Sequence, residues 1–291
     1  MGMPASEEQA DVVLLFGGDG TVHRHLGQLV RVGVPVLVVP AGSGNDFARA
    51  LGLRRVRDSL AAWRKFLCDA CNVRRIDLGL IRSMDRGNTS SSRRAGENSS
   101  TGHAGSVPDA PVTRYFCCVA GVGLDGEVAR RANRLPRWLR GHGGYVLSLA
   151  PALLTFVPLK MKILTEDEGE SGRNDPKNWT IRSDQPCLLA AFANTPHYGG
   201  GMKIAPLAKI DDGLLDICIV GAVARPRLLR LAPKVYGGRH LTVPEVKYFQ
   251  NRLVRVETEG RHEVYADGEY VCRTPVEVGV QRAALKIVTA E

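Results

Sequence analysis

Residues 12–21 read VVLLFGGDGT, an unbroken apolar run that ends in a glycine-rich turn. Such a run is typical of a buried strand, and a helical pattern follows it from about residue 21 to residue 32. A second apolar run, residues 35–39, ends in the same manner in PAGSGND, residues 40–46. Strand, glycine turn and helix, repeated in this order, predict a parallel α/β sheet.

The two glycine turns predict a phosphate site. Glycine lets the backbone approach a polyphosphate, whose oxygens bind N–H groups at the start of a helix. Ligands of open α/β sheets bind at the carboxyl ends of the strands, so both turns should lie at one edge. Asp19 would repel a phosphate unless a cation lay between them, which favours Asp19 acting on Mg²⁺, directly or through water. Taken alone, the turn could also be structural, with Asp19 capping the helix that follows.

The sequence pattern of the chain changes near residue 114. From there on, short runs rich in β-forming residues alternate with Gly, Pro or Asp turns. We therefore expect an α/β nucleotide-binding domain over residues 1–113 and a mainly antiparallel β domain over residues 114–291, with the last strand able to pack back on the first domain. Residues 83–111 are mostly Ser, Gly, Asn and Arg, which indicates a disordered insertion.

A third glycine pattern, Gly121 to Gly126, formally matches the dinucleotide-binding motif G-x-G-x-x-G. That motif also needs an acidic residue about twenty positions later, and residues 137–146 contain none. We interpret this stretch as a turn near the domain boundary.

The composition limits which classes of binding partner are expected. The 291 residues carry a formal net charge of +9, which favours anionic partners such as nucleotides or anionic lipid surfaces. No zinc-finger spacing or aromatic RNA-binding motif supports nucleic acid. Arginines and a Trp between residues 130 and 140 could instead rest on anionic headgroups, or form an ordinary solvated surface. The oligomeric state stays open, a homodimer included.

Localisation follows from cysteine usage and hydropathy. Seven cysteines, an odd number, fit reduced thiols in a cytosolic protein. Cys68 and Cys71 form a C-x-x-C without the second pair or the His that a zinc site needs. The longest apolar run, residues 145–159, is shorter than a membrane span and contains two prolines. We expect a cytoplasmic protein with peripheral membrane association.

The two glycine motifs together resemble the diacylglycerol kinase catalytic domain family, which includes bacterial diacylglycerol and related lipid kinases and the sphingosine and ceramide kinases. The resemblance extends through NTPHYGGGMKIAP (residues 194–206), DDGLLD (residues 211–216) and DGE (residues 267–269). It implies a two-domain, ATP-dependent lipid kinase, with diacylglycerol to phosphatidic acid as the expected reaction.

The resemblance also implies roles for single residues. Asp19 and Asp46 would order the Mg²⁺ network of the ATP site. A second, structural metal would be held by Asp212, with backbone carbonyls of Lys209 and Leu214. Glu269 would be the general base for the lipid hydroxyl, although from the residues alone it would be an exposed hairpin glutamate. ATP contacts would come from the two turns, at Gly17, Gly18, Gly20, Thr21, Ser43 and Asn45.

The sequence departs from the family pattern at two places. The family usually has a further strand and an Asn-Pro-x-x-Gly loop upstream of Gly-Gly-Asp-Gly-Thr, whereas this sequence starts a few residues before Val12, as a fragment, a misplaced start or a degenerate enzyme would. The family also often has Asn-Glu where this chain has His23 and Arg24. Two alternatives therefore stay open: an NAD kinase, which shares the first motif, and a protein that binds lipid or nucleotide without turnover.

Overall fold

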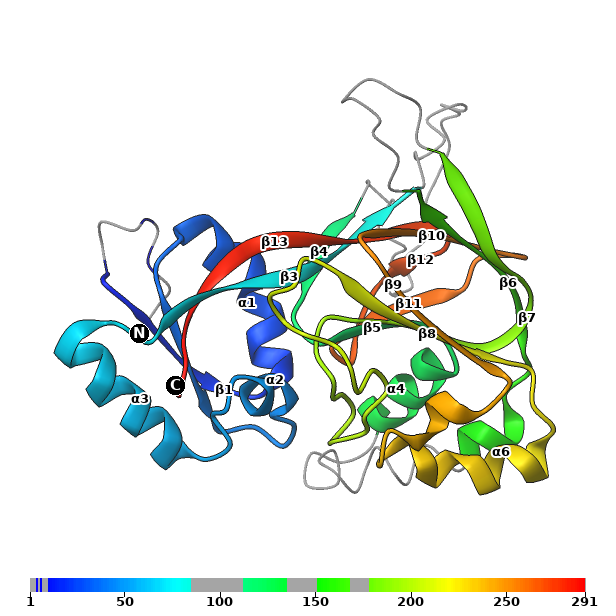
Figure 1. The fold of residues 1–291 in the computed structure, drawn as a ribbon, viewed down its shortest axis with the longest axis horizontal. Coiled ribbons are helices and arrows are strands. Elements are labelled where there is room, and N and C mark those ends of the chain that lie inside the picture. Colours follow the sequence, from blue (N-terminus) through cyan, green and yellow to red (C-terminus); the bar gives the residue numbers. More distant parts are fainter. Residues whose placement is uncertain are drawn as a thin grey trace, which may run out of the picture.

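The structure is a computed structural model that describes residues 10–84, 112–134, 151–167 and 178–290, together with residues 4 and 6. It has an α/β part and a larger β-rich part, and two long strands run from one part into the other (Figure 1). The elements of the first part are β1 (Val13–Gly17), α1 (Asp19–Val32), β2 (Val36–Pro40), α2 (Asp46–Ala50), α3 (Val56–Asp69) and β3 (Val73–Ser83).

The second part contains most of the strands. Its elements are β4 (Thr113–Phe116), β5 (Val119–Gly123), α4 (Leu124–Arg134), β6 (Leu159–Glu166), β7 (Trp179–Ala193), β8 (Leu215–Gly221), α6 (Arg225–Leu231), the 3₁₀ turns η3 (Ala232–Val235) and η4 (Arg239–Thr242), β9 (Val246–Asn251), β10 (Leu253–Thr258), β11 (Glu263–Ala266), β12 (Glu269–Arg273) and β13 (Val276–Val288).

Parallel pairing defines the first part. Strand β1 pairs with β2 in parallel, and β2 meets β13 in parallel where Val36 is opposite Ile287. Helix α1 covers this sheet because its apolar residues recur at helical spacing and are buried, and it ends at Gly33 in the left-handed conformation. The buried positions of α1 are Val22, Leu26, Leu29 and Val32.

Strand β1 is the first strand of the sheet order among the described residues. Its side chains alternate in burial: Val13 and Leu15 face the core, while Leu14 is 42% and Phe16 is 64% exposed. Among the described residues, the outward side of β1 is therefore apolar and partly exposed to solvent, whereas both sides of β2 are buried.

The second part is a set of antiparallel pairings in the order β13-β10-β6-β7-β5-β11-β12, with β8 and β9 branching from β7. Its interior is a separate apolar cluster built on side chains such as Phe116, Phe192 and Met161. The predicted fold class, a parallel α/β domain followed by a mainly antiparallel β domain, is confirmed.

Strands β3 and β13 hold the two parts together. They pair with each other in antiparallel fashion from Val276 opposite Ser83 to Val288 opposite Val73. Buried Asp77 on β3 fixes this arrangement, because its carboxylate accepts the N–H groups of Gly213 and Ala283, each at 2.7 Å. The boundary proposed at residue 113 stays a prediction.

Three expectations concern segments that the structure describes only in part or not at all. Residues 85–111 of the expected insertion lie outside the described residues, and so do residues 135–140 of the basic segment at 130–140 and residues 145–150 of the apolar run at 145–159. Within the described residues, every helix is too short or too polar to cross a bilayer. All seven cysteines are free thiols, with Cys68 and Cys71 exposed and the other five buried.

Candidate functional site

The two glycine turns pack against each other backbone to backbone. The N–H of Asp19 donates to the carbonyl of Gly44 at 3.2 Å, and the N–H of Ala41 donates to the carbonyl of Gly17 at 3.1 Å. A Cβ atom on Gly18 would collide with the carbonyl oxygen of Gly44. Glycine at position 18 is therefore required by the approach of the second turn.

Asp19 joins the two turns through its side chain. It is the first residue of α1, but its carboxylate accepts the N–H groups of Asp46 and Phe47, both at 3.0 Å, at the start of α2. The alternative that Asp19 caps its own helix is wrong, because the cap of α1 is Gly18 and makes no side-chain bond. Burial raises the pKa of Asp19 to about 6. The hydrogen bond from Phe47 opposes this rise, and the charges of Asp46 and Asp267 add to it.

Asp46 connects the first domain to the loop of residues 194–206, which we call the 194–206 loop. The side chain is almost fully buried. One carboxylate oxygen accepts the guanidinium of Arg49, and the other accepts the N–H of Gly200 at 2.8 Å. The second glycine turn is thereby tied to the β-rich part.

The other predicted ATP contacts have different surroundings. Asn45 closes its own turn, because its amide donates to the Gly42 carbonyl at 2.8 Å and accepts the Gly42 N–H at 3.1 Å. Ser43 is exposed at the tip of this turn. The side chain of Thr21 lies close against Gly17. Asn45 therefore has a structural role in the turn, and Ser43 keeps a hydroxyl that a ligand can reach.

Glu269 reaches the first glycine turn from the second domain. A Cβ atom on Gly20 would be 3.2 Å from Oε1 of Glu269. Glu269 begins β12 directly after the turn at Asp267 and Gly268, whose φ angles of 50° and 84° match a tight hairpin turn. We call residues 266–269 the Asp267 turn. The structure thus brings Asp19, Asp46 and Glu269 to the same two glycine turns.

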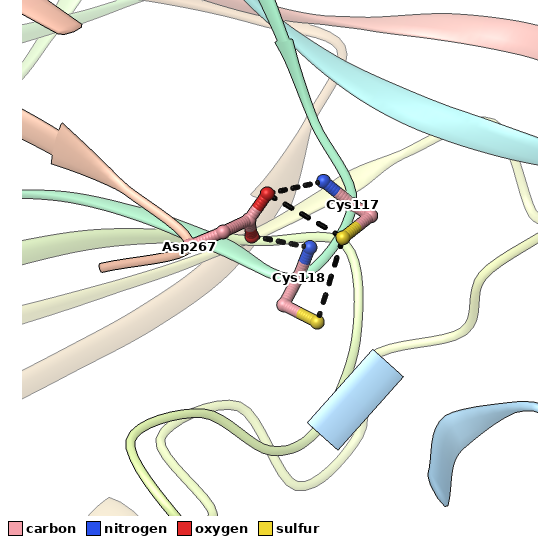
Figure 2. Close-up of side chains that lie close together, drawn as sticks. All are labelled: Cys117, Cys118 and Asp267. Atoms are coloured by element: carbon pink, nitrogen blue, oxygen red, sulfur yellow. Dashed lines mark hydrogen bonds between the residues drawn. The ribbon is translucent and has the colours of Figure 1, made fainter. Parts of the chain in front are cut away.

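Asp267 is the site residue that the sequence did not single out. Its fully buried carboxylate accepts the N–H of Cys117 at 2.9 Å, of Cys118 at 2.8 Å and of Val119 at 3.3 Å. It also accepts the Cys117 thiol at 3.4 Å and Nδ1 of His23 at 3.0 Å. Figure 2 shows the carboxylate facing the two cysteines. An Asp-Gly pair between two β runs is the signal for this turn.

Cys117, Cys118 and Asp267 are close enough to share a metal ion, and they are the one such group among the described His, Cys, Asp and Glu side chains. The donor set does not fit a metal, because the carboxylate already accepts three backbone N–H groups. Burial raises the pKa of Cys117 well above its ordinary value, and the pKa of Cys118 is raised to about 12. The hydrogen bond from Cys117 opposes the rise at Cys118, while burial and nearby carboxylates cause it. Thiols held in the neutral form are poor metal ligands.

The Mg²⁺ that the sequence predicts fits better at Asp19 and Asp46. Both side chains supply oxygen atoms, which Mg²⁺ prefers, and their mutual repulsion would be relieved by a cation. Each carboxylate oxygen already accepts an N–H group. A cation would therefore be reached through remaining lone pairs or through its bound water.

The second predicted metal site lies at the turn of residues 211–213. Asp212 accepts the N–H of Leu214 at 3.0 Å and the side chain of Gln250 at 3.4 Å. The guanidinium of Arg282 lies against Gly213, so a positive charge already stands beside this turn. No described contact tests the carbonyl of Lys209, and this metal site stays a prediction.

An apolar cavity lies in the second domain on the other side of the 194–206 loop. Tyr198 and Met202 of that loop line it, although the same loop binds Asp46 through Gly200. Asp125 and His240 are the charged or ionisable members of the lining besides Tyr198. The aliphatic lining comes from α4, β7, β8, α6 and the turns after it: Leu124, Val128, Leu188, Leu189, Val220, Leu228, Leu231, Val235 and Val243.

Two protein families match the chain. The family described as the diacylglycerol kinase catalytic domain matches residues 3–81. The family described as the YegS C-terminal NAD kinase beta sandwich-like domain matches residues 118–289, which is more than half of the chain.

Individual proteins agree with these families. A diacylglycerol kinase of Mycobacterium tuberculosis is 33% identical over 278 residues, covering 96% of this chain and 76% of the relative. A diacylglycerol kinase of Bacillus subtilis is 24% identical over 268 residues, covering 91% and 73%. The solved structure of a diacylglycerol kinase from Bacillus anthracis has a TM-score of 0.62 and 19% identity, covering 97% of this chain and 78% of that one, and supports the fold alone.

Proposed function

This chain belongs to the family of bacterial diacylglycerol kinases and YegS-like lipid kinases, and on that premise we propose that it transfers the γ-phosphoryl group of ATP to the free hydroxyl of diacylglycerol. The product is phosphatidic acid. The observation that carries the proposal is the carboxylate of Glu269, which comes from the β-rich domain and lies against Gly20 of the first glycine turn.

The proposed mechanism uses few side chains. Backbone N–H groups of the two glycine turns bind the phosphate oxygens, and no covalent enzyme intermediate is needed. Glu269 accepts the proton of the lipid hydroxyl while the oxygen of that hydroxyl forms a bond to the γ-phosphorus. ADP leaves with the electron pair of the broken P–O bond. Mg²⁺, when bound, neutralises charge on the phosphate oxygens. Asp19 and Asp46 would hold that cation through oxygen lone pairs or through its bound water.

The apolar cavity supports a lipid as the acceptor. Its lining is almost entirely aliphatic, which suits an acyl chain and does not suit a nucleotide ribose. The 194–206 loop lies between the cavity and the second glycine turn, because it lines the one and binds Asp46 of the other. A lipid with its chain in the cavity would have its hydroxyl near the phosphate turns.

We also propose that the lipid is taken from an anionic bilayer by the surface around α4. Arg130 and Arg131 lie there, and both bind Glu127. Leu154 and Val157, which are 46% and 66% exposed, follow in the next described segment. Basic and exposed apolar side chains together are the usual features of a peripheral membrane surface.

The test is a kinase assay with radiolabelled ATP, Mg²⁺ and a panel of diacylglycerol, sphingosine, ceramide and NAD. Diacylglycerol should be phosphorylated fastest. Glu269→Gln and Asp19→Ala should each lower turnover by at least about 100-fold. Glu259→Gln, at an exposed residue of the same domain, is the matched control and should leave the rate unchanged.

Each other outcome of the assay overturns part of the proposal. Phosphorylation of NAD in place of a lipid would identify an NAD kinase. Binding of diacylglycerol and ATP without turnover would identify a binding protein. Turnover that survives Glu269→Gln would remove Glu269 from the role of base.

A further inference from the structure

His23 connects the two domains at the Asp267 turn. It lies on α1 four positions after Asp19, about one helical turn, so the two side chains lie on the same side of the helix. Its Nδ1 atom is 3.0 Å from Oδ2 of Asp267, and its side chain is 12% exposed. A carboxylate only accepts hydrogen bonds, so Nδ1 carries a proton and Nε2 is the atom that titrates.

The other hydrogen bonds that the described residues make to this carboxylate come from the second domain. Cys117, Cys118 and Val119 donate their N–H groups, and Cys117 adds its thiol. Asp267 is therefore fixed to the β-rich domain. Among the described residues, His23 is its one donor from the α/β domain.

The position of Glu269 depends on this turn. Glu269 is exposed, so packing does not hold its side chain. Only Gly268 separates it from Asp267, in a turn whose two central residues have positive φ. A shift of Asp267 relative to α1 would move the Glu269 carboxylate away from Gly20, which lies three residues before His23 on the same helix.

We propose that His23 is a positioning residue: its hydrogen bond to Asp267 holds Glu269 against the glycine turn of the first domain. The inference rests on the proposed function, in which Glu269 takes the proton of the lipid.

The charged groups around His23 determine how the contact depends on pH. Asp267 and Glu269 face it from the turn, and Arg114 faces it from β4. Burial lowers the pKa of His23, but the hydrogen bond and charge of Asp267, helped by Glu269 and opposed by Arg114, hold the pKa above its ordinary value. The ion pair is therefore complete at acidic pH and becomes a neutral hydrogen bond as the pH rises through that pKa.

Two substitutions separate positioning from a merely structural role. His23→Leu keeps bulk and removes the donor. His23→Asn keeps a donor at the same number of bonds from Cα as Nδ1, but that donor does not titrate. We expect His23→Leu to lower kcat by about 10- to 100-fold while the KM values for ATP and lipid change less than about threefold. His23→Asn should restore most of kcat.

The pH profile is the readout that a structural role would not change. The ratio of wild-type kcat to His23→Asn kcat should fall as the pH rises from about 6 to about 9, because only the wild type loses an ion pair. A ratio that stays flat, or a His23→Leu variant with wild-type kcat, would overturn the proposal.

Two further measurements do not need turnover, so they remain informative if the substrate assignment fails. Hydrogen exchange of residues 264–270 should be faster in His23→Leu than in the wild type and near wild type in His23→Asn. The NMR titration of the His23 ring should give a lower pKa in Asp267→Asn than in the wild type. Unchanged exchange together with an unchanged ring pKa would show that the contact does not exist in solution.

Discussion

Replacing Asp267 by Asn should destabilise the protein although the two side chains have nearly the same shape. Asp267 accepts three buried backbone N–H groups and one His ring N–H. An Asn amide keeps one acceptor oxygen and puts an NH₂ donor in the place of the other. At least one buried N–H group, that of Cys117 or that of Cys118, then faces another donor.

The magnitude follows from these contacts. A hydrogen bond to a charged acceptor contributes about 1.5–3 kcal/mol, and a buried N–H left without a partner costs about 1–3 kcal/mol. Because the two terms overlap, we expect Asp267→Asn to lower the free energy of unfolding by about 2–4 kcal/mol. Backbone strain adds little, since Asn tolerates the φ of 50° at this position at least as well as Asp.

Urea unfolding followed by tryptophan fluorescence measures this loss, with the midpoint and slope compared between variants. Asp184→Asn is the matched control, because Asp184 is exposed on β7 and should change stability by less than about 0.5 kcal/mol. If Asp267→Asn unfolds at the same urea concentration as this control, the carboxylate does not hold the turn and the reasoning fails.

Three further predictions concern the glycine turns, pH and the cavity. Gly18→Ala should abolish nucleotide binding in calorimetry, because a Cβ there collides with the second turn, whereas Gly27→Ala on the open side of α1 should bind normally and be about 0.5–1 kcal/mol more stable. Asp19 holds its proton more tightly in the folded state, with a pKa of about 6 against about 3.9 unfolded. Metal-free protein should therefore lose up to about 3 kcal/mol of stability as the pH rises from 4 to 7, and urea unfolding of the wild type in EDTA should show a steeper loss than that of Asp19→Ala. Val220→Phe should raise the KM for long-chain diacylglycerol by about tenfold or more and leave the KM for ATP unchanged, as steady-state kinetics with short- and long-chain lipids would reveal.

The glycine turns could be predicted from the sequence because their cause is local. Apolar runs of five residues followed by glycine fix strand and turn within a few positions, and the contact between Gly18 and Gly44 explains why glycine is present. The role of Asn45 could not be predicted in this way. A polar residue in a turn can face a ligand or its own backbone, and only coordinates show that its amide binds Gly42.

The contacts that join the domains could not be predicted from sequence patterns. Asp267 binds Cys117 across 150 positions and His23 across 244 positions, and no periodicity reports on pairs so distant. The sequence did mark His23, but only as a departure from the family motif. Its partner became identifiable once β11, β5 and α1 were placed side by side.

Strand β1 has a consequence for anyone who handles this protein. Leu14 and Phe16 are partly exposed on β1, which is the edge strand of the sheet among the described strands. An extended segment from a neighbouring molecule can pair with such an edge strand, and Leu14 and Phe16 would add apolar contacts to it. Wherever this edge is open, concentrated preparations should self-associate through it while the Asp267 turn is still intact, and dilute samples then report most faithfully on the single molecule.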